Sequence, residues 1–327
     1  MNWKSTSALV TGAGGFIGSH LTEALVRAGA RTRALVHYNS EGGRGWLDES
    51  AVKDDVEIVA GDVREIDSVR AALKSVDVVF HLAALIAIPY SYVSPSSYVS
   101  TNIVGTFNML QESLHSGVSR FVHTSTSEVY GTAKEVPISE EHPLQAQSPY
   151  SATKIGADKL AESFHRSFEL PLSIVRPFNT YGPRQSARAI IPTIMIQALA
   201  REAIRVGNLT PTRDFNFVED TVRGFLLNAG CAEAVGRVIH LGTGEETSIG
   251  DLARLICSLI GVECRIVQDE QRVRPSKSEV DRLLADPGAA EKIIGWRPQT
   301  SLAEGLQRTL DWIRLNSDRY RPEVYAV

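Results

Sequence analysis

Leu9-Val10-Thr11-Gly12-Ala13-Gly14-Gly15-Phe16-Ile17-Gly18 is the stretch of sequence that decides the fold. Its first three residues end a predicted strand, and three glycines, Gly12, Gly15 and Gly18, follow in the spacing GxxGxxG. The first glycine permits a tight turn, the second lets the backbone approach a pyrophosphate, and the third lets helix and strand pack closely. Phe16 and Ile17 open an apolar pattern of helical period, so the phosphates of a dinucleotide are expected at a helix N-terminus.

Outward from this loop, apolar runs of strand length alternate with segments of helical period. The runs are residues 8–10, 32–36, 56–59, 76–82, 120–123 and 172–175. Such alternation is typical of an α/β fold with a doubly wound, Rossmann-type parallel sheet covered by helices on both faces. After residue 177 prolines break the pattern into shorter elements. Residues 215–228 and 237–241 are expected to return to the sheet.

These patterns predict two unequal parts of the chain. The first is a dinucleotide-binding Rossmann domain at residues 1–179 and 214–247. The second is a smaller, discontinuous α+β lobe that binds the substrate, at residues 180–213 and 248–327.

The composition argues against several classes of protein. With 43% hydrophobic and 22% charged residues the chain of 327 residues is an ordinary globular protein, and its net charge of −4 gives no basic field for nucleic acid or an anionic membrane. No run of 18 apolar residues occurs, so a cytoplasmic protein without a membrane partner is expected. The cysteines, three in number, form no CxxC pair, and the eight histidines show no ligand spacing, so no metal site is expected. His81 and His123 fall on predicted strands and are expected in the core.

The adenosine end of the cofactor site is less distinctive. A carboxylate at the end of the second strand would bind the ribose hydroxyls and select NAD, but none stands there. Polar and basic residues that could contact a 2′-phosphate follow instead, namely His37, Asn39, Ser40 and Arg44. A solvated loop is the alternative, and NAD and NADP both stay open. Asp62, which Val63 follows, is placed to reach the adenine or to cap a turn.

Two Tyr-x-x-x-Lys pairs are candidates for a catalytic base. Lys134 of the first pair, which begins at Tyr130, lies in a predicted loop, whereas Tyr150 opens a helix that also carries Lys154. Residues four apart share a helix face, so the Lys154 ammonium is expected near the Tyr150 oxygen. A neighbouring cation favours the phenolate that takes a proton from a hydroxyl. We therefore predict that Tyr150 is the base of an alcohol oxidation.

A run of hydroxyl and carboxylate side chains ends the fifth strand, where ligands of doubly wound sheets bind. It contains Thr126, Ser127 and Glu128. Strand alternation would put Thr126 and Glu128 on one side, facing the site. Glu128 could take a proton from carbon or give one to a leaving hydroxyl, and a helix cap or a salt bridge is its structural alternative.

Together these residues resemble the extended short-chain dehydrogenase/reductase family, and the likeness covers essentially the whole chain. The resemblance implies an oligomeric enzyme acting on nucleotide sugars, with a homodimer as its usual state. It also implies a hydride-transfer triad of Thr126, Tyr150 and Lys154. Family members that are 4,6-dehydratases carry Thr-Asp-Glu or Thr-Ser-Glu at the strand end, and the second form matches residues 126–128.

Three further stretches are similar to bacterial N-acetylglucosamine-nucleotide 4,6-dehydratases of legionaminic acid pathways. They are LAALIAIPYS at 82–91, RPFNTYGPRQSAR at 176–188 and RPSKSEV at 274–280. By this resemblance Leu82, Ala83 and Ala84 contact the cofactor. The residues expected to contact the substrate are Ile86, Asn179, Arg184, Arg213 and Arg274, and for Arg213 a structural ion pair is the alternative.

The implied reaction is a 4,6-dehydration of UDP- or GDP-linked N-acetylglucosamine to a 4-keto-6-deoxy sugar, with transient hydride transfer to bound NAD(P). Two enzyme alternatives of the same family stay open. UDP-glucuronate decarboxylases share Thr-Ser-Glu, and 4-epimerases share everything except Glu128. An NAD(P)-binding sensor without catalysis is the alternative from another class, because fold alone does not imply chemistry.

Overall fold

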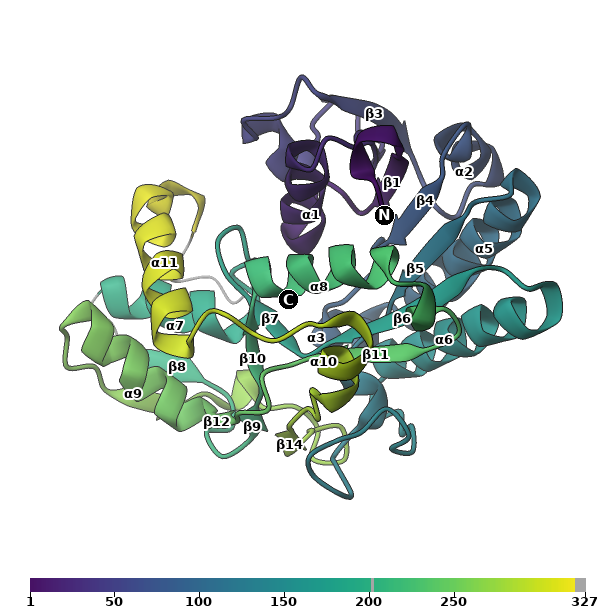
Figure 1. Cartoon of the computed structure of the whole chain (residues 1–327). Helices are drawn as coiled ribbons and strands as arrows, with labels where there is room; N and C mark the ends of the chain where they lie inside the picture. The colour runs from purple at the N-terminus through teal and green to yellow at the C-terminus, as the bar shows by residue number, and fades with distance from the viewer. Residues whose placement is uncertain (201–202, 321–327) are drawn as a thin grey trace.

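The structure, a computed structural model, describes residues 1–200 and 203–320 (Figure 1). Its centre is a parallel sheet in the order β11-β6-β5-β4-β1-β2-β3. These strands are β1 (Ser7–Thr11), β2 (Arg31–His37), β3 (Val56–Gly61), β4 (Val78–His81), β5 (Arg120–Thr124), β6 (Leu172–Pro177) and β11 (Val238–Leu241). Strand order reverses between β1 and β4, the point at which doubly wound sheets bind ligands. The predicted α/β fold class is therefore confirmed.

Helices cover both faces of this sheet (Figure 1). On one face α1 (Phe16–Arg27) packs against α8 (Val218–Gly230). On the other, α5 (Gly105–Ser116) packs between α2 (Ile66–Leu73) and α6 (Pro149–Phe168). Alternation along β1 divides the core, because Ala8 and Val10 join the apolar cluster under α1 and Leu9 joins the cluster on the opposite side.

The remaining helices of the sheet domain shape its connections. After β4 the chain forms α3 (Ile88–Val93), α4 (Pro95–Tyr98) and a π-helical turn, Val99–Val104, that runs into α5. Short 3₁₀ turns lie at Trp3–Ser5, Gly45–Glu49, Ser127–Tyr130, Ala232–Ala234, Glu270–Arg272 and Ser317–Arg319.

Short strands and helices from the later part of the chain form a second group beside the sheet. The strands are β7 (Asn179–Tyr181) with β10 (Phe215–Phe217), β8 (Ile204–Val206) with β13 (Ile266–Gln268), and β9 (Thr212–Arg213) between β12 (Thr247–Ser248) and β14 (Arg282–Leu283). The helices are α7 (Ile190–Leu199), α9 (Ile249–Ile260), α10 (Gly288–Ile294) and α11 (Leu302–Leu315). Helix α7 packs against α9 and α11, whereas α10 packs against α8 and β11. Among helices of the described ranges, none has the length and apolar character needed to cross a bilayer.

Two details differ from the sequence-based expectations. The predicted strand at 76–82 is shorter, because Val76 ends a turn bonded to Leu73 and Leu82 leaves the sheet to donate its N–H to the Thr11 hydroxyl. Of the segments expected to return to the sheet, β11 pairs with β6, but Phe215–Phe217 pairs with β7 outside the central sheet. The second segment therefore returns as a strand, and the first returns through α8, which packs against β5 and β6.

Candidate active site

A cavity of about 880 Å³ opens along the carboxyl ends of the central strands and continues between them and the shorter strands. Ligand pockets commonly enclose about 300–1,000 Å³, so this cavity is near the upper end of the range. Its lining joins the glycine loop, the ends of β2, β4, β5 and β6, the start of α6 and residues of β7 and β9.

The glycine loop is too crowded for side chains and leaves helix amides available, which fits a bound pyrophosphate. Gly12 has a φ of +68°, and a Cβ there would lie 3.0 Å from the Ala83 nitrogen. A Cβ on Gly18 would lie 2.2 Å from the Gly12 oxygen. Gly15 caps α1 without a side-chain hydrogen bond, so the first N–H groups of the helix can bind an anion at the cavity wall that Phe16 and Ile17 continue.

Next to the end of β2, where the sequence predicts the adenosine, His37, Asn39 and Arg44 line the cavity. Asn39 closes its own turn by bonding both the N–H and the carbonyl of Gly43, at 3.0 and 2.8 Å. Ser40 is not part of the lining. The end of β2 thus presents an imidazole, an amide and a guanidinium to the cavity, as the sequence predicts.

Asp62 and Val63, the other predicted adenosine contacts, lie outside the lining. Arg64 bonds both Asp62 carboxylate oxygens and is the main cause of a lowered Asp62 pKa. Val63 packs against Gly105 of α5. This arrangement supports the turn-capping alternative for Asp62.

The segment after β4 forms the floor of the cavity. Leu82, Ala83 and Ala84 line it, and the Thr11 hydroxyl accepts the N–H of both Leu82 and Ala83. His81, directly before them, is buried between the hydroxyls of Thr11 and Thr106, as expected of a core histidine. The described residues contain no cluster of three or more His, Cys, Asp and Glu side chains that could hold a metal.

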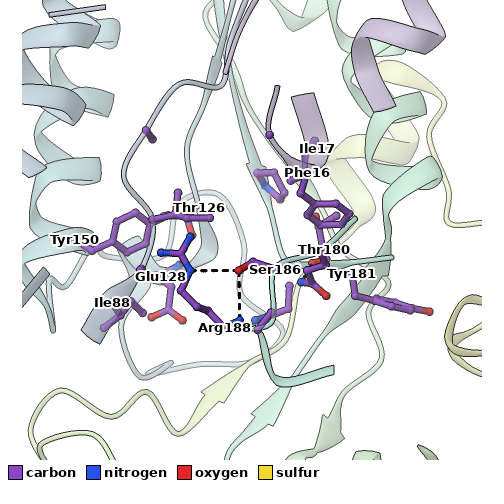
Figure 2. A pocket seen from close by; sticks show the side chains of 18 of the residues that line it. Phe16, Ile17, Ile88, Thr126, Glu128, Tyr150, Thr180, Tyr181, Ser186 and Arg188 are labelled. Atoms are coloured by element: carbon purple, nitrogen blue, oxygen red, sulfur yellow. Dashed lines mark hydrogen bonds between the residues drawn. The ribbon is translucent and has the colours of Figure 1, made fainter. Parts of the chain in front are cut away.

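Tyr150 and Lys154 lie near the start of α6 and line the cavity. Figure 2 shows the Tyr150 side chain beside Thr126. Pro149 opens this helix, and Ser148 and Ser151 form a capping box that fixes its first turn. The Tyr150 ring stands edge-on to Tyr98 at 6.3 Å, and its hydroxyl hydrogen-bonds with Thr126. The Lys154 ammonium donates to the Thr124 carbonyl at 2.6 Å.

The predicted acidification of Tyr150 by Lys154 is not what these contacts produce. Burial raises the pKa of the Tyr150 phenol, and the hydrogen bond from Thr126 acts in the opposite direction. Burial also lowers the pKa of the Lys154 ammonium to about 8. The lysine reaches the end of β5 instead of the phenol, so Thr126 is the neighbour that favours the phenolate.

Glu128 lines the cavity together with Thr126 and Ser127, but not for the predicted reason. Strand β5 ends at Thr124, and Ser127–Tyr130 is a 3₁₀ turn capped by the Thr126 hydroxyl, which accepts the Glu128 N–H at 3.2 Å. The strand alternation invoked for these residues was therefore wrong, and a tight turn brings their side chains to the same cavity (Figure 2).

The half of the cavity lined by β7 and β9 is rich in guanidinium groups. Asn179, Arg213, Arg274 and Ile86 line it as predicted. Arg213 and Arg274 both approach the Glu279 carboxylate, at 3.7 and 3.8 Å, so the structural ion pair considered for Arg213 exists within the cavity wall. The Asn179 Oδ1 and the Arg274 Nη1 are buried without a hydrogen-bond partner.

Arg184 does not line the cavity. Its guanidinium pairs with the buried Glu23 of α1 at 2.7 Å and donates to Ser19, so it ties the loop after β7 to the Rossmann domain. The structure gives no support to the predicted substrate contact.

Sequence reasoning missed several lining residues of the same region, namely Gln185, Ser186, Arg188, Asn208, Arg272 and Glu279. Arg188 projects toward the side that carries Thr126 and Glu128, and its Nε donates to Ser186 at 3.3 Å (Figure 2). The resemblance of residues 176–188 included Arg188, but no sequence pattern decides whether Arg184 or Arg188 turns inward.

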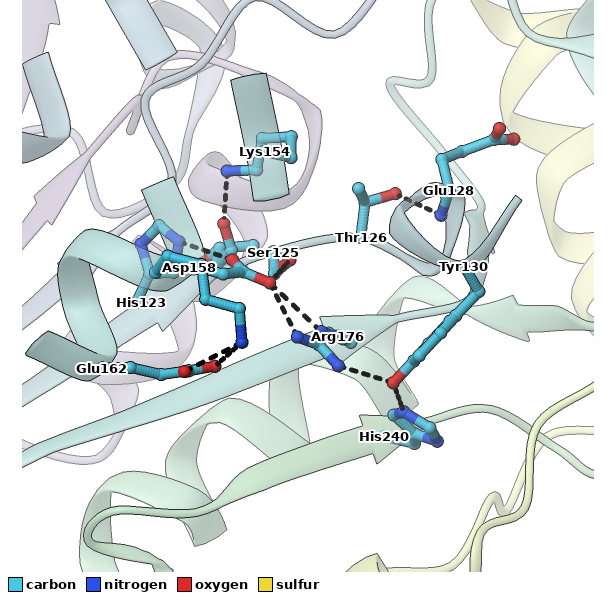
Figure 3. A network of polar contacts seen from close by, with 12 residues as sticks. His123, Ser125, Thr126, Glu128, Tyr130, Lys154, Asp158, Glu162, Arg176 and His240 are labelled. Carbon is cyan, nitrogen blue, oxygen red and sulfur yellow. Dashed lines mark hydrogen bonds and ion pairs between the residues drawn. The ribbon is translucent and has the colours of Figure 1, made fainter. Parts of the chain in front are cut away.

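The other Tyr-x-x-x-Lys pair has a different environment, as the helix argument predicted. Tyr130 is buried outside the cavity lining, between Arg176 and His240, while Lys134 lies in the following loop (Figure 3).

Comparisons with known proteins cover almost the whole chain. Residues 9–309 match the family model described as GDP-mannose 4,6 dehydratase. A dTDP-glucose 4,6-dehydratase of Streptomyces antibioticus is 35% identical over 321 residues, which cover 96% of this chain and 94% of the relative. A UDP-glucose 4-epimerase of Mycolicibacterium smegmatis is 34% identical over 94% of this chain and 99% of the relative.

Among solved structures, the dTDP-glucose 4,6-dehydratase DesIV of Streptomyces venezuelae, determined with NAD bound, superposes with a TM-score of 0.88. The two sequences are 31% identical, and the match covers 97% of this chain and 99% of that one. Dehydratases and epimerases both occur among the similar proteins, so the comparisons do not distinguish these two reactions. Any distinction must come from the residues of the site.

Proposed function

The chain belongs to the extended short-chain dehydrogenase/reductase family of nucleotide-sugar dehydratases and epimerases, and we propose that within it the protein is a 4,6-dehydratase. Its proposed substrate is UDP- or GDP-linked N-acetylglucosamine, and its product is the 4-keto-6-deoxy sugar still attached to the nucleotide. The similarity of three sequence stretches to legionaminic acid dehydratases supports this choice of sugar.

The observation that carries the proposal is the Glu128 carboxylate in the cavity beside Thr126 and Tyr150. A 4-epimerase needs one base at the sugar O4, whereas loss of water across C5 and C6 also needs a group that removes the C5 proton and protonates the leaving hydroxyl. A carboxylate can carry out both proton transfers in turn. It is protonated when it takes the C5 proton, and it is a carboxylate again once it has protonated the leaving hydroxyl.

The proposed roles of the chain's own residues follow from these positions. Tyr150 acts as a phenolate that the hydrogen bond from Thr126 stabilises, and it accepts the O4 proton while the C4–H bond breaks. Glu128 then takes the C5 proton and delivers it to the C6 hydroxyl, which leaves as water. The proton that Tyr150 holds is passed to C5, directly or through solvent, when hydride is added at C6, so Tyr150 ends as the phenolate it was at the start. A bound nicotinamide would supply the acceptor for the C4 hydride and return that hydride to C6.

The cofactor would lie between the glycine loop and the β4 segment, with its adenosine toward His37, Asn39 and Arg44. NAD in the solved DesIV complex supports NAD here. The imidazole and guanidinium at the end of β2 also suit a 2′-phosphate, so NADP is the alternative that a direct binding comparison of the two dinucleotides would decide.

Segments 180–213 and 248–327 form the proposed nucleotide-sugar lobe. Arg213 and Arg274 would pair with the diphosphate, since forked guanidinium donors suit phosphate oxygens, and Asn179 offers a buried amide. Arg188 lies toward the sugar end and favours one alternative, UDP-glucuronate decarboxylase, because a guanidinium could bind the uronate carboxylate.

The mass of the product separates these reactions. Purified protein with NAD would be incubated with UDP- and GDP-linked N-acetylglucosamine, glucose and glucuronate, and the nucleotide sugars analysed by mass spectrometry. We expect loss of one water from an N-acetylglucosamine nucleotide. Loss of carbon dioxide from the glucuronate would establish the decarboxylase, and an isomer of unchanged mass would establish an epimerase.

We further propose a cytoplasmic homodimer. The outer surface of α5 and α6 carries exposed apolar side chains, with Phe107 at 40% and Phe168 at 54% exposure, joined through Phe164 by edge-on ring contacts. Two neighbouring helices with an apolar face can pair with a second copy of themselves across a two-fold axis. The second copy would bury both rings.

A further inference from the structure

A buried polar cluster lies behind the active site, centred on the Asp158 carboxylate (Figure 3). Asp158 is fully buried and accepts hydrogen bonds from His123 at 3.1 Å, from Ser125 at 2.7 Å and from two nitrogens of Arg176 at 2.9 and 3.2 Å. A third nitrogen of Arg176 donates to the Tyr130 hydroxyl at 2.6 Å. We call these five residues the Asp158 cluster.

The cluster is joined to the catalytic residues at two points. Asp158 is four residues after Lys154 on α6, and thus on the same helix face. Ser125, which donates to Asp158, stands between Thr124 and Thr126 at the end of β5. The carbonyl of Thr124 holds the Lys154 ammonium, and Thr126 bonds Tyr150.

Asp158 also balances the charge of Lys154. Burial lowers the pKa of Lys154 to about 8, and the charge of Asp158 opposes this fall. Burial alone would raise the pKa of Asp158, but the His123 hydrogen bond and the charges of Arg176 and Lys154 hold it at about 2. Burial lowers the pKa of His81 and His123, so both imidazoles that interact with Lys154 are neutral at pH 7.

We propose that Asp158 is a positioning residue of the reaction, which keeps Lys154 a charged ammonium on the Thr124 carbonyl and fixes the end of β5 that carries Thr126 and Glu128. A purely structural ion pair with Arg176 would need neither the shared helix face with Lys154 nor the bond to Ser125. The proposal rests on the proposed function for its catalytic meaning, but its central claim concerns the protonation of one lysine.

The test is a pH titration of Lys154 in the whole protein, followed by the ¹³Cε signal of labelled lysine and assigned by its loss in Lys154→Met. We expect a midpoint near 8 in the parent protein. In Asp158→Asn the ammonium loses its counter-charge, and we expect a midpoint lower by at least about one pH unit, so that at pH 8 the charged fraction falls from about one half to about one tenth.

The same variant should change the kinetics in a defined way. The high-pH limb of kcat should move to lower pH with the lysine titration, while KM changes little, because the Asp158 side chain does not line the cavity. A parent-like lysine midpoint in folded Asp158→Asn would overturn the inference. Since the titration needs no substrate, it stands or falls separately from the mass-spectrometric test of the proposed function.

Two further variants distinguish a general loss of stability from a specific effect on Lys154. Tyr130→Phe removes the hydroxyl at the far end of the cluster and should lower Tm while leaving the Lys154 midpoint unchanged; an equal shift in this variant would also overturn the inference. If Asp158→Asn does not fold, Asp158→Asn with Arg176→Met removes both charges of the buried pair together, which proteins tolerate better than an unpaired charge. It should show the same lowered Lys154 midpoint.

Discussion

Replacement of Gly18 by alanine is a sharp test of the proposed cofactor site. Gly18 lies in the first turn of α1, and a Cβ there would meet the Gly12 oxygen at 2.2 Å, where ordinary contacts begin at 3.4 Å. Both groups are backbone-fixed, so no side-chain rotation can relieve the overlap. The loop or the helix must therefore move by about 1.2 Å, the difference between these two distances.

A shift of this size would break hydrogen bonds between the α1 amides and a phosphate, because such bonds do not survive a lengthening from about 2.9 to about 4 Å. One lost hydrogen bond to a charged group is worth about 1.5–3 kcal/mol, which is roughly a 10- to 150-fold increase in Kd. Overpacking would lower the free energy of unfolding by about 1–3 kcal/mol. The higher helix propensity of alanine would offset about 1 kcal/mol of this loss.

Gly156 provides the matched control. It also lies within a helix, α6, but a Cβ there would meet only the end of the Ile103 side chain, at 3.1 Å. Calorimetric titration with NAD should give a Kd at least tenfold higher for Gly18→Ala, whereas Gly156→Ala should bind like the parent. Parent-like binding by folded Gly18→Ala would refute the assignment of the glycine loop to the pyrophosphate.

Three further predictions concern the reaction and the assembly. Glu128→Gln should leave NAD binding and the first hydride transfer intact but lower the rate of water loss by at least about 100-fold, seen by mass spectrometry, and near-normal turnover would remove Glu128 from the mechanism. Tyr150→Phe should abolish the nicotinamide absorbance change in a single turnover, since no group then accepts the O4 proton, and a normal change would identify another base. Phe107→Glu should convert a dimer to a monomer in analytical ultracentrifugation, whereas Leu315→Glu, at a side chain 85% exposed on α11, should not; a dimeric Phe107→Glu protein would place the interface elsewhere.

The fold followed from the sequence because its signals are local. Apolar runs buried on both faces mark the strands of a parallel sheet, and the glycine spacing marks the turn between β1 and α1. Both depend on neighbours within a few residues. Phe215–Phe217 had the same apolar character as a sheet strand, but β7 is its partner, and strand partners are chosen by the whole fold.

The site was predicted less completely, because several of its side chains are positioned by residues that are distant in the sequence. The period-2 argument placed Glu128 in the cavity although the backbone there is a 3₁₀ turn, so the position agreed while the cause was wrong. Arg184 and Arg188 lie four positions apart in an irregular loop, and which of them turns inward depends on Glu23, which lies 161 residues before Arg184 and binds it. No sequence pattern within the loop indicates that Arg184 binds Glu23.

The buried Asp158 carboxylate behind the site is not part of the Tyr-x-x-x-Lys motif, and burial explains why it is needed. Tyr150, Lys154 and Asp158 stand at successive i, i+4 positions of α6, and their exposure falls from 6% to 4% to 0% as the helix leaves the cavity. A lysine this deeply buried loses its charge unless a carboxylate accompanies it, and a carboxylate this deep stays charged only with donors around it. The Lys154 ammonium at the cavity therefore requires Asp158 one turn deeper, and Asp158 in turn requires Arg176, His123 and Ser125. Substitution of Asp158, Arg176 or His123 is expected to act on the reaction through Lys154 and the end of β5, even though none of these three side chains lines the cavity.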